Sequence, residues 1–214
     1  MDGTQLSFPL EEKRILQKQS CEKKIILIKD IPGLQYIENY LSDDEQSKIL
    51  ANVDEGIWLK DLKRRVQHYG FKYNYKARKV DMSMHVGELP EWLKELSVKL
   101  REEGYMAKEP DQVIINEYEP GQGISAHIDC EPCFQDTIIS LSLGSSCVMD
   151  FTNKFEKTHK VPIWLDPGSL IVLSDEARYD WLHAIAPRKY DKKNGEKHER
   201  HRRVSLTYRK VIIK

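Results

Sequence analysis

The pattern of hydrophobic and polar positions divides the chain into a first part with helical spacing and a second part with strand spacing. Ser42 followed by Glu45 forms a capping box, and apolar residues on the next turns predict a helix over residues 43–53. A second helix is predicted after Pro90, because leucines follow at helical spacing and Gly104 stands where a C-terminal cap belongs. Residues 25–31 predict a strand, and residues 1–24 a charged N-terminal arm or helix.

From residue 112 onward the pattern becomes typical of short strands. Seven segments are rich in β-branched and aromatic residues and are separated by Gly, Pro-Gly and Asn-Gly turn signals. These segments are residues 113–115, 137–143, 148–151, 161–165, 169–173, 181–185 and 204–213. Strands with almost no helix between them indicate an antiparallel sandwich or barrel. We therefore predict a mainly β, α+β domain over residues 25–214, with its β core at about 110–213 and an exposed lysine-rich loop over 192–197.

Composition narrows the class of protein. Lys and Arg number 34, as do Asp and Glu, so a nucleic-acid partner would need a local basic patch rather than bulk charge. The longest aliphatic runs hold four residues, against about twenty for a membrane span. The N-terminus has no pattern of a secretion signal. We expect an intracellular, cytoplasmic or nuclear protein that is not secreted, has no membrane partner and can act as a monomer.

Two histidines and a carboxylate are candidate metal ligands. His127 and Asp129 are two positions apart, so an extended segment points both side chains to one face. His183 lies in the strand-like residues 181–185. Two His and one carboxylate form the facial triad of non-haem Fe(II). Alone, the triplet is weak, because it also arises by chance and a lone histidine is more often structural than a ligand.

The C-terminal strand carries two arginines on one face. Arg203, Ser205, Thr207 and Arg209 share that face, and Val204, Leu206 and Tyr208 share the other. Arginines inside a barrel mouth cost several kcal/mol unless an anion pairs with them. A dicarboxylate would satisfy both through bidentate hydrogen bonds. The alternative is an edge strand whose arginines face water.

These segments together resemble the AlkB family of Fe(II)- and 2-oxoglutarate-dependent dioxygenases. The resemblance rests on the residues 116–124 (NEYEPGQGI), the H-x-D motif, residues 139–144 (ISLSLG), His183 and the R-x-S-L-T-x-R run at 203–209, all in order. Residues 62–66 and 110–112 further resemble the branch that contains the tRNA wobble-uridine hydroxylase domain. The resemblance implies a double-stranded β-helix (jelly-roll) core with flanking N-terminal helices.

It also implies roles for single residues. His127, Asp129 and His183 would ligate iron, with O2 as the oxidant and ascorbate as a stimulant. The residues that would hold 2-oxoglutarate are Asn116, Tyr118, Arg203, Ser205 and Arg209, with Arg203 on the distal carboxylate. Ser205 departs from the family, where many members have Asn. Glu131 occupies a position that in the family often carries an acidic residue near the substrate base.

A basic and aromatic stretch is the candidate substrate face. Residues 60–79 hold eight Lys or Arg, Arg78 among them, and a single acid. Within them Tyr69, Phe71, Tyr73 and Tyr75 alternate, as on one face of a strand. Cations between stacking rings suit a flipped base and its backbone. The alternative is a buried sheet face with solvated lysines, and the resemblance favours the base pocket. Residues 187–203 form a second basic stretch, either a phosphate grip or a solubilising loop.

The four cysteines are expected to be reduced thiols, as is usual in intracellular proteins. A zinc site joining Cys130 and Cys133 to His198 and His201 is the less favoured alternative.

For function, the sequence and its resemblance favour an oxidative demethylase of alkylated bases in DNA or RNA. The open alternatives are a hydroxylase of a modified tRNA wobble uridine, a non-catalytic nucleic-acid-binding module and a protein hydroxylase.

Overall fold

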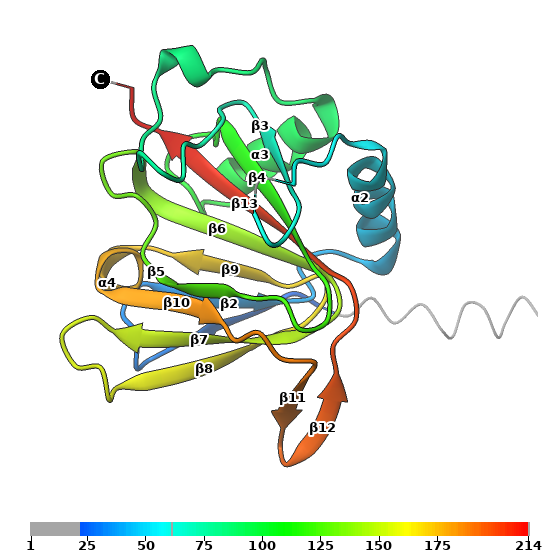
Figure 1. The fold of residues 1–214 in the computed structure, drawn as a ribbon, viewed down its shortest axis with the longest axis vertical. Helices are drawn as coiled ribbons and strands as arrows, with labels where there is room; N and C mark the ends of the chain where they lie inside the picture. Colours follow the sequence, from blue (N-terminus) through cyan, green and yellow to red (C-terminus); the bar gives the residue numbers. More distant parts are fainter. Residues whose placement is uncertain (1–21, 61, 214) are drawn as a thin grey trace, which may run out of the picture.

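Two antiparallel β-sheets face each other in the computed structural model, which describes residues 22–60 and 62–213 (Figure 1). The larger sheet has seven strands, in the spatial order β1 (Lys24–Leu27), β2 (Leu34–Glu38), β9 (Leu170–Leu173), β6 (Phe134–Gly144), β13 (Arg203–Val211), β4 (Gln112–Tyr118) and β3 (Val66–Tyr69). The smaller sheet runs β5 (Ile124–His127), β10 (Trp181–Ile185), β7 (Cys147–Asn153) and β8 (Lys160–Leu165). The predicted mainly β, jelly-roll architecture is confirmed.

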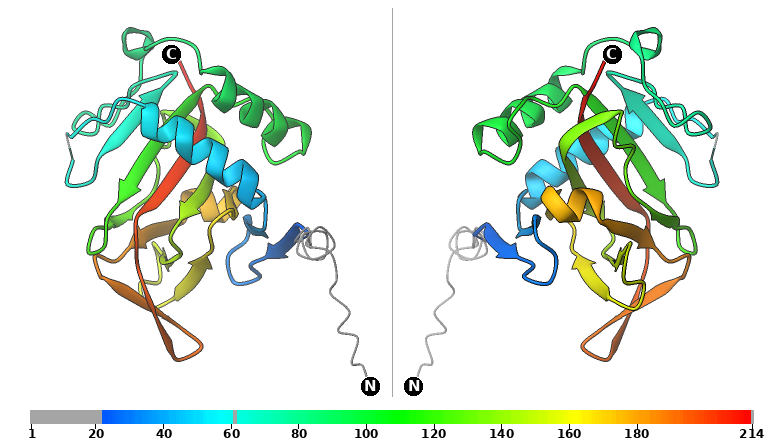
Figure 2. Two further views of the ribbon diagram at one scale, coloured as in Figure 1. Left: turned by 90° about the vertical axis from the view of Figure 1, so that its right-hand side faces the viewer. Right: turned by 90° about the vertical axis from the view of Figure 1, so that its left-hand side faces the viewer.

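The two predicted helices lie on the outer face of the larger sheet (Figure 2). In α2 (Asp43–Glu55) the capping box forms, because Glu45 N–H donates to Ser42 Oγ at 3.3 Å and Glu45 Oε2 accepts from Ser42 N–H at 2.8 Å. α3 (Glu91–Glu102) begins after Pro90, and Gly104 ends it with φ +80°. Both helices bury their apolar sides against the sheet.

Strand β13 divides the interior into two layers. Val204, Leu206 and Tyr208 point to the helices and belong to the outer core. The alternate side chains point between the sheets and line a cavity there; they are Arg203, Ser205, Thr207 and Arg209. The predicted two-faced strand is therefore observed. The inner core includes residues of both sheets, such as Ile138, Phe151 and Trp181, so the sheets share one interior.

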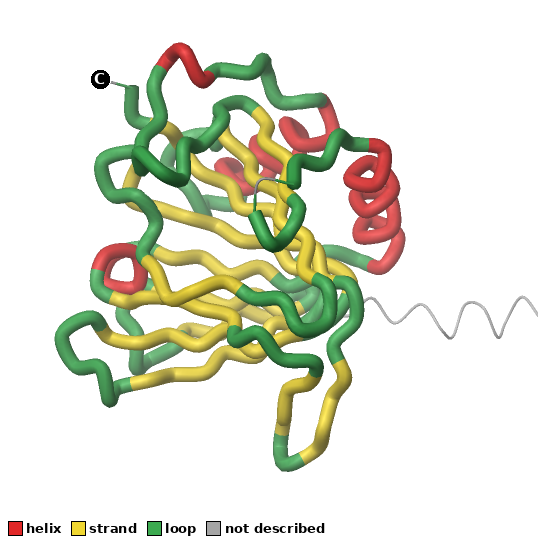
Figure 3. Tube along the Cα trace, in the orientation of Figure 1, coloured by secondary structure: helices red, strands yellow, loops and turns green. Residues whose placement is uncertain are grey.

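Several short elements were not predicted (Figure 3). Residues 192–197 are not a loop but most of a hairpin, β11 (Tyr190–Lys193) and β12 (Glu196–Glu199). Its turn is Asn194-Gly195, and both residues have positive φ, as tight hairpin turns require. The strand predicted over 25–31 ends at Leu27. α4 (Asp175–Tyr179) and the 3-10 turn η1 (Met82–Met84) are too short to show periodicity.

The predicted aromatic strand over Tyr69–Tyr75 is wrong. β3 ends at Tyr69, and Gly70 follows with φ +73°. A Cβ at Gly70 would lie 1.8 Å from the carbonyl oxygen of Asp111, so only glycine fits this turn. The chain changes direction there, and the four rings do not share one strand face.

The cysteine prediction is also wrong in part. Cys130 and Cys133 form a disulfide, while Cys147 is free and buried. The Cys133 N–H donates to the Cys130 carbonyl in a tight turn, which brings the two Cα atoms to 5.3 Å. The predicted N-terminal arm or helix lies outside the described residues, apart from 22–24. No helix in the described ranges combines the length and the apolar character needed to cross a membrane.

Candidate metal and co-substrate site

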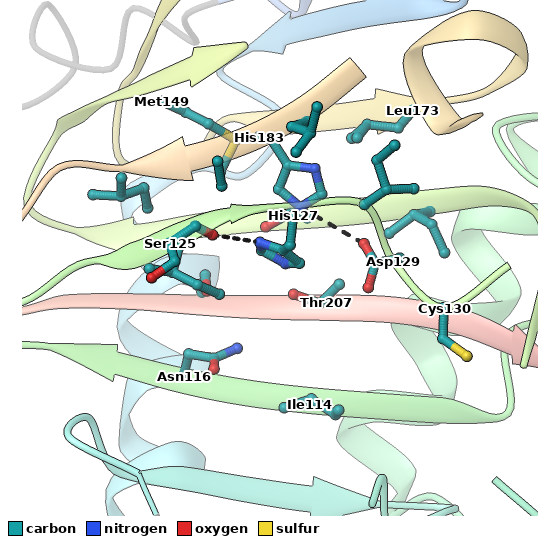
Figure 4. Close-up of a pocket in the computed structure, with 18 of the residues that line it drawn as sticks. Ile114, Asn116, Ser125, His127, Asp129, Cys130, Met149, Leu173, His183 and Thr207 are labelled. Atoms are coloured by element: carbon teal, nitrogen blue, oxygen red, sulfur yellow. Dashed lines mark hydrogen bonds and ion pairs between the residues drawn. The ribbon is translucent and has the colours of Figure 1, made fainter. Parts of the chain in front are cut away.

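The metal-ligand candidates meet where β5 and β10 pair. His127 ends β5 and His183 is its direct register partner on β10. Asp129 follows β5 by two residues, and its Oδ2 lies 3.7 Å from Nε2 of His183. One ligand atom from each of the three residues lies within 4.8 Å of the others. Figure 4 shows all three side chains converging in the cavity between the sheets. No other cluster within residues 22–60 and 62–213 has this arrangement of ligand atoms.

The protonation states suit a divalent cation. Burial and the neighbouring His127 lower the pKa of His183 to about 3, so its imidazole is neutral. Burial raises the pKa of Asp129, but Arg209, followed by the two histidines, outweighs burial and holds that pKa well below its ordinary value. His127 places Nδ1 2.8 Å from the Ser125 carbonyl, which fixes the tautomer that leaves Nε2 free. A neutral imidazole and an ionised carboxylate are ligands that Fe(II) binds.

Asp129 is held by two arginines from different elements. Arg209 Nη2 on β13 donates to Asp129 Oδ1 at 2.6 Å. Arg178 on α4 donates to the carbonyls of Asp129 (3.0 Å) and Cys130 (3.4 Å) in the same loop and to that of Gln135 (3.5 Å) at the start of β6. Arg178 is 2% exposed. No sequence pattern indicates this role, because a single arginine in a short helix has no distinguishing spacing.

The second end of the cavity carries an unsatisfied guanidinium. Arg203 is 3% exposed, and its Nη2 donates to Ser142 Oγ at 2.8 Å. Its Nε and Nη1 are buried with no partner among the described residues. Such buried charged donors cost free energy unless an anion pairs with them. Tyr118 packs near this guanidinium, with 5.4 Å from Arg203 Cζ to the ring centroid. The site therefore fits a carboxylate-bearing co-substrate.

The remaining predicted co-substrate residues line the same cavity. Asn116 and Ser205 face each other across the β4–β13 pairing. Asn116 Oδ1 accepts from Arg64 Nε at 2.8 Å, which adds Arg64 to the cavity wall. Burial raises the pKa of Tyr118, so its hydroxyl stays protonated and can donate.

The structure brings only some of the predicted substrate residues to the cavity. Tyr73, Tyr75, Arg78 and Glu131 line it. Tyr69 packs instead against Trp92 of α3, and Phe71 against His85. Cys130 and Cys133 place their sulfurs 3.2 and 3.4 Å from the Arg78 carbonyl. His198, the proposed zinc partner, packs against Trp164 on the hairpin side.

Comparisons with known proteins agree with this geometry. The model of the 2OG-Fe(II) oxygenase superfamily matches residues 33–209. The tRNA (carboxymethyluridine(34)-5-O)-methyltransferase ALKBH8 of Mus musculus is 44% identical over 171 residues, 75% of this chain and 25% of the relative. The chain is an AlkB-type member of the 2OG-Fe(II) oxygenase superfamily. The DNA N6-methyl adenine demethylase of Caenorhabditis elegans is 33% identical over 94% of this chain and 66% of its own length.

The solved structure of OsALKBH1 supports the same fold, with a TM-score of 0.66 at 16% identity over 87% of this chain and all of the other. Membership in the superfamily implies Fe(II), 2-oxoglutarate and O2, and the chain is a dioxygenase that uses them. It spans only about a quarter of the length of mouse ALKBH8.

Proposed function

We propose that this AlkB-type domain oxidises a modified base in nucleic acid, first of all by demethylating alkylated bases in DNA or RNA. The observation that carries the proposal is one cavity of about 680 Å³ that holds the His127–Asp129–His183 cluster and the unpaired guanidinium of Arg203. We assign the three clustered residues to iron. A metal-binding end and an anion-binding end in one cavity suit a dicarboxylate that reaches the iron.

Five residues would hold 2-oxoglutarate. Arg203 would bind its distal carboxylate through Nε and Nη1, which have no partner among the described residues. Tyr118 and Ser205 offer hydroxyl groups beside Arg203, and Asn116 offers its amide. Arg209 is engaged with Asp129, so it would orient the iron ligand and keep it ionised while facing the co-substrate. With Fe(II) and O2, 2-oxoglutarate supplies the oxidative decarboxylation that drives hydroxylation of a C–H bond.

The substrate side of the cavity has the residues that a flipped base requires. Tyr73 and Tyr75 meet edge to face, with ring centroids 5.0 Å apart, and offer stacking surface. Arg78 and Glu131 supply one charge of each sign for polar groups of the base. These assignments place the base between the ring pair and the iron ligands. A hydroxylated N-methyl group would leave as formaldehyde and restore the base.

A second candidate is hydroxylation of a modified tRNA wobble uridine, in which the hydroxyl group stays. The 44% identity to ALKBH8, whose name refers to carboxymethyluridine 34 of tRNA, favours it. The demethylase of Caenorhabditis elegans, which spans more of this chain, favours base demethylation. A non-catalytic binding module would have no need for the complete metal cluster or for Arg203. We also propose that the domain acts as a monomer in the cytoplasm or nucleus.

The test measures succinate and formaldehyde on matched methylated DNA and RNA oligonucleotides and on bulk tRNA, with Fe(II), 2-oxoglutarate and ascorbate. The His127→Ala protein is the blank. Formaldehyde that depends on the oligonucleotide supports demethylation. Succinate without formaldehyde on tRNA supports wobble hydroxylation. If iron-loaded protein releases no succinate and no formaldehyde on any of these substrates, the proposed function is overturned.

A further inference from the structure

The β11–β12 hairpin projects from the body of the domain (Figure 1) and is anchored to it at its base. Asp191 at its base is 2% exposed. It accepts hydrogen bonds from Arg188 Nε (2.6 Å), Arg200 Nε (2.6 Å) and the Val148 N–H of β7 (3.2 Å). A solubilising loop would need no such buried anchor. These bonds therefore fix the base of the hairpin to the body of the domain.

Several of the hairpin's exposed side chains are basic or aromatic; Glu196 and Glu199 are exposed as well, and Glu199 pairs with Lys197 at 3.3 Å. Lys197 Nζ lies 4.7 Å from the ring centroid of Tyr190, which is 44% exposed. Lys193 Nζ lies 4.9 Å from the ring centroid of Trp164 on β8. Lys189 and Lys192 are exposed and form no ion pair with any residue in the described part of the chain. These two lysines, one residue before and two residues after the exposed Tyr190, therefore have no counter-ion among the described residues.

Contacts join this hairpin to the cavity. Gly121 N–H donates to the Arg188 carbonyl at 3.2 Å. The next residue, Gln122, donates from Nε2 to the Lys63 carbonyl at 3.0 Å. Lys63 is exposed and lies between Leu62 and Arg64, both of which line the cavity. The β4–β5 turn therefore bridges the cavity wall and the hairpin base.

Lys63, Lys189 and Lys192 form what we call the basic track. We propose that the basic track binds the sugar-phosphate backbone of a single-stranded polynucleotide whose modified base occupies the cavity. This inference rests on the proposed function and extends it to the nucleotides beside the target. The chain has no net charge, so backbone affinity must come from local sites of this kind. Tyr190 offers a flanking base a surface for stacking.

The test compares two variants with equal charge change. Lys189→Glu/Lys192→Glu alters the basic track, and Lys48→Glu/Lys94→Glu alters exposed lysines on α2 and α3, which cover the opposite face of the larger sheet. All four side chains are exposed, so neither pair removes packing. Binding of labelled single-stranded RNA and DNA of about 12 nucleotides is followed by fluorescence anisotropy between about 50 and 200 mM salt, with the iron site filled by Mn(II).

We expect the track variant to reduce the slope of log affinity against log salt by about 1.4, because each lost phosphate contact on a single strand removes ~0.7. The helix variant should keep the wild-type slope. Equal slopes for the two variants would overturn the basic track. Succinate release by wild-type protein on a modified oligonucleotide separates the two proposals. Turnover with equal slopes leaves the proposed function standing and removes only the track, whereas no binding and no turnover overturns both.

Discussion

Replacing Arg178 by Met removes a buried guanidinium whose only described acceptors are three main-chain carbonyls, two in the loop that carries Asp129 and one at the start of β6. The side-chain volume is nearly kept, so the loss is mainly one of hydrogen bonds. A buried carbonyl left unpaired costs about 1–3 kcal/mol. The 3.0 Å bond to Asp129 should count in full and the two longer bonds less. Because the guanidinium no longer has to be desolvated, we expect a net loss of about 3 kcal/mol in the free energy of unfolding.

For a domain of this size, that loss lowers the melting temperature by about 6–12 °C. Metal affinity should fall as well, because Arg178 fixes the carbonyl of the residue that supplies the carboxylate ligand. Loss of such an outer partner typically costs about 10- to 100-fold in metal affinity. Thermal unfolding gives the first quantity and calorimetric titration with Mn(II) the second. Arg178→Lys should recover part of both, because its ammonium group can still donate to the Asp129 carbonyl.

Arg200→Met is the matched control. Arg200 is also a buried arginine, but its partners are Asp191 and the Ala186 carbonyl at the hairpin base. It should destabilise the fold without weakening Mn(II) binding. Wild-type Mn(II) affinity in Arg178→Met, or an equal loss in both variants, would refute the positioning of Asp129 by Arg178.

Three further predictions concern other parts of the molecule. Arg203→Met should weaken 2-oxoglutarate binding, measured by calorimetry, by about 10- to 100-fold, because one or two charge-assisted bonds are lost; unchanged affinity would remove Arg203 from the anion site. Burial raises the pKa of Asp191, but the hydrogen bonds from Arg200, Val148 and Arg188 outweigh burial, so its folded pKa lies below the ordinary value. Its stabilisation is therefore present above about pH 4 and lost as pH falls through the folded pKa. Asp191→Asn should be less stable to urea than wild type at neutral pH and lose less stability on acidification, and parallel pH profiles would contradict this. Tyr75→Ala should raise the KM for an oligonucleotide by about 10-fold through lost stacking and leave 2-oxoglutarate affinity unchanged, whereas an unchanged KM would exclude Tyr75 from the base pocket.

Alternation along the strands was sufficient to predict only part of the metal cluster. His127, Asp129 and the two faces of residues 203–209 depend on strand geometry alone, which a period of two describes well. Their meeting with His183 depends on the β5–β10 register, which no sequence pattern showed; the resemblance to AlkB proteins named His183 as the third ligand. The capped helix at α2 was predictable because its capping box is a local hydrogen-bond pattern.

The failures arise where one residue overrides the pattern. The aromatic alternation from Tyr69 to Tyr75 indicated one strand, but the left-handed conformation at Gly70 turns the chain after the first ring. The hairpin at residues 190–199 looked like a loop because its strands are short and charged, and its anchor is a single buried aspartate. Arg178 acts through carbonyl groups of a distant loop, a contact that exists only once the fold has formed.

In the two-faced strand β13, side chains that line the cavity alternate with side chains that pack against the helices. Its even-numbered positions from Val204 to Tyr208 support the helical layer, and its odd-numbered positions from Arg203 to Arg209 support the cavity. Deleting one residue early in β13 would exchange these roles along the rest of the strand, because a strand slipped by one position shows its other face. It would press Arg209 against α2 and α3 and turn an apolar row toward the proposed iron ligands. Single substitutions in this strand can therefore change the cavity or the core one position at a time, whereas an insertion or deletion changes both at once.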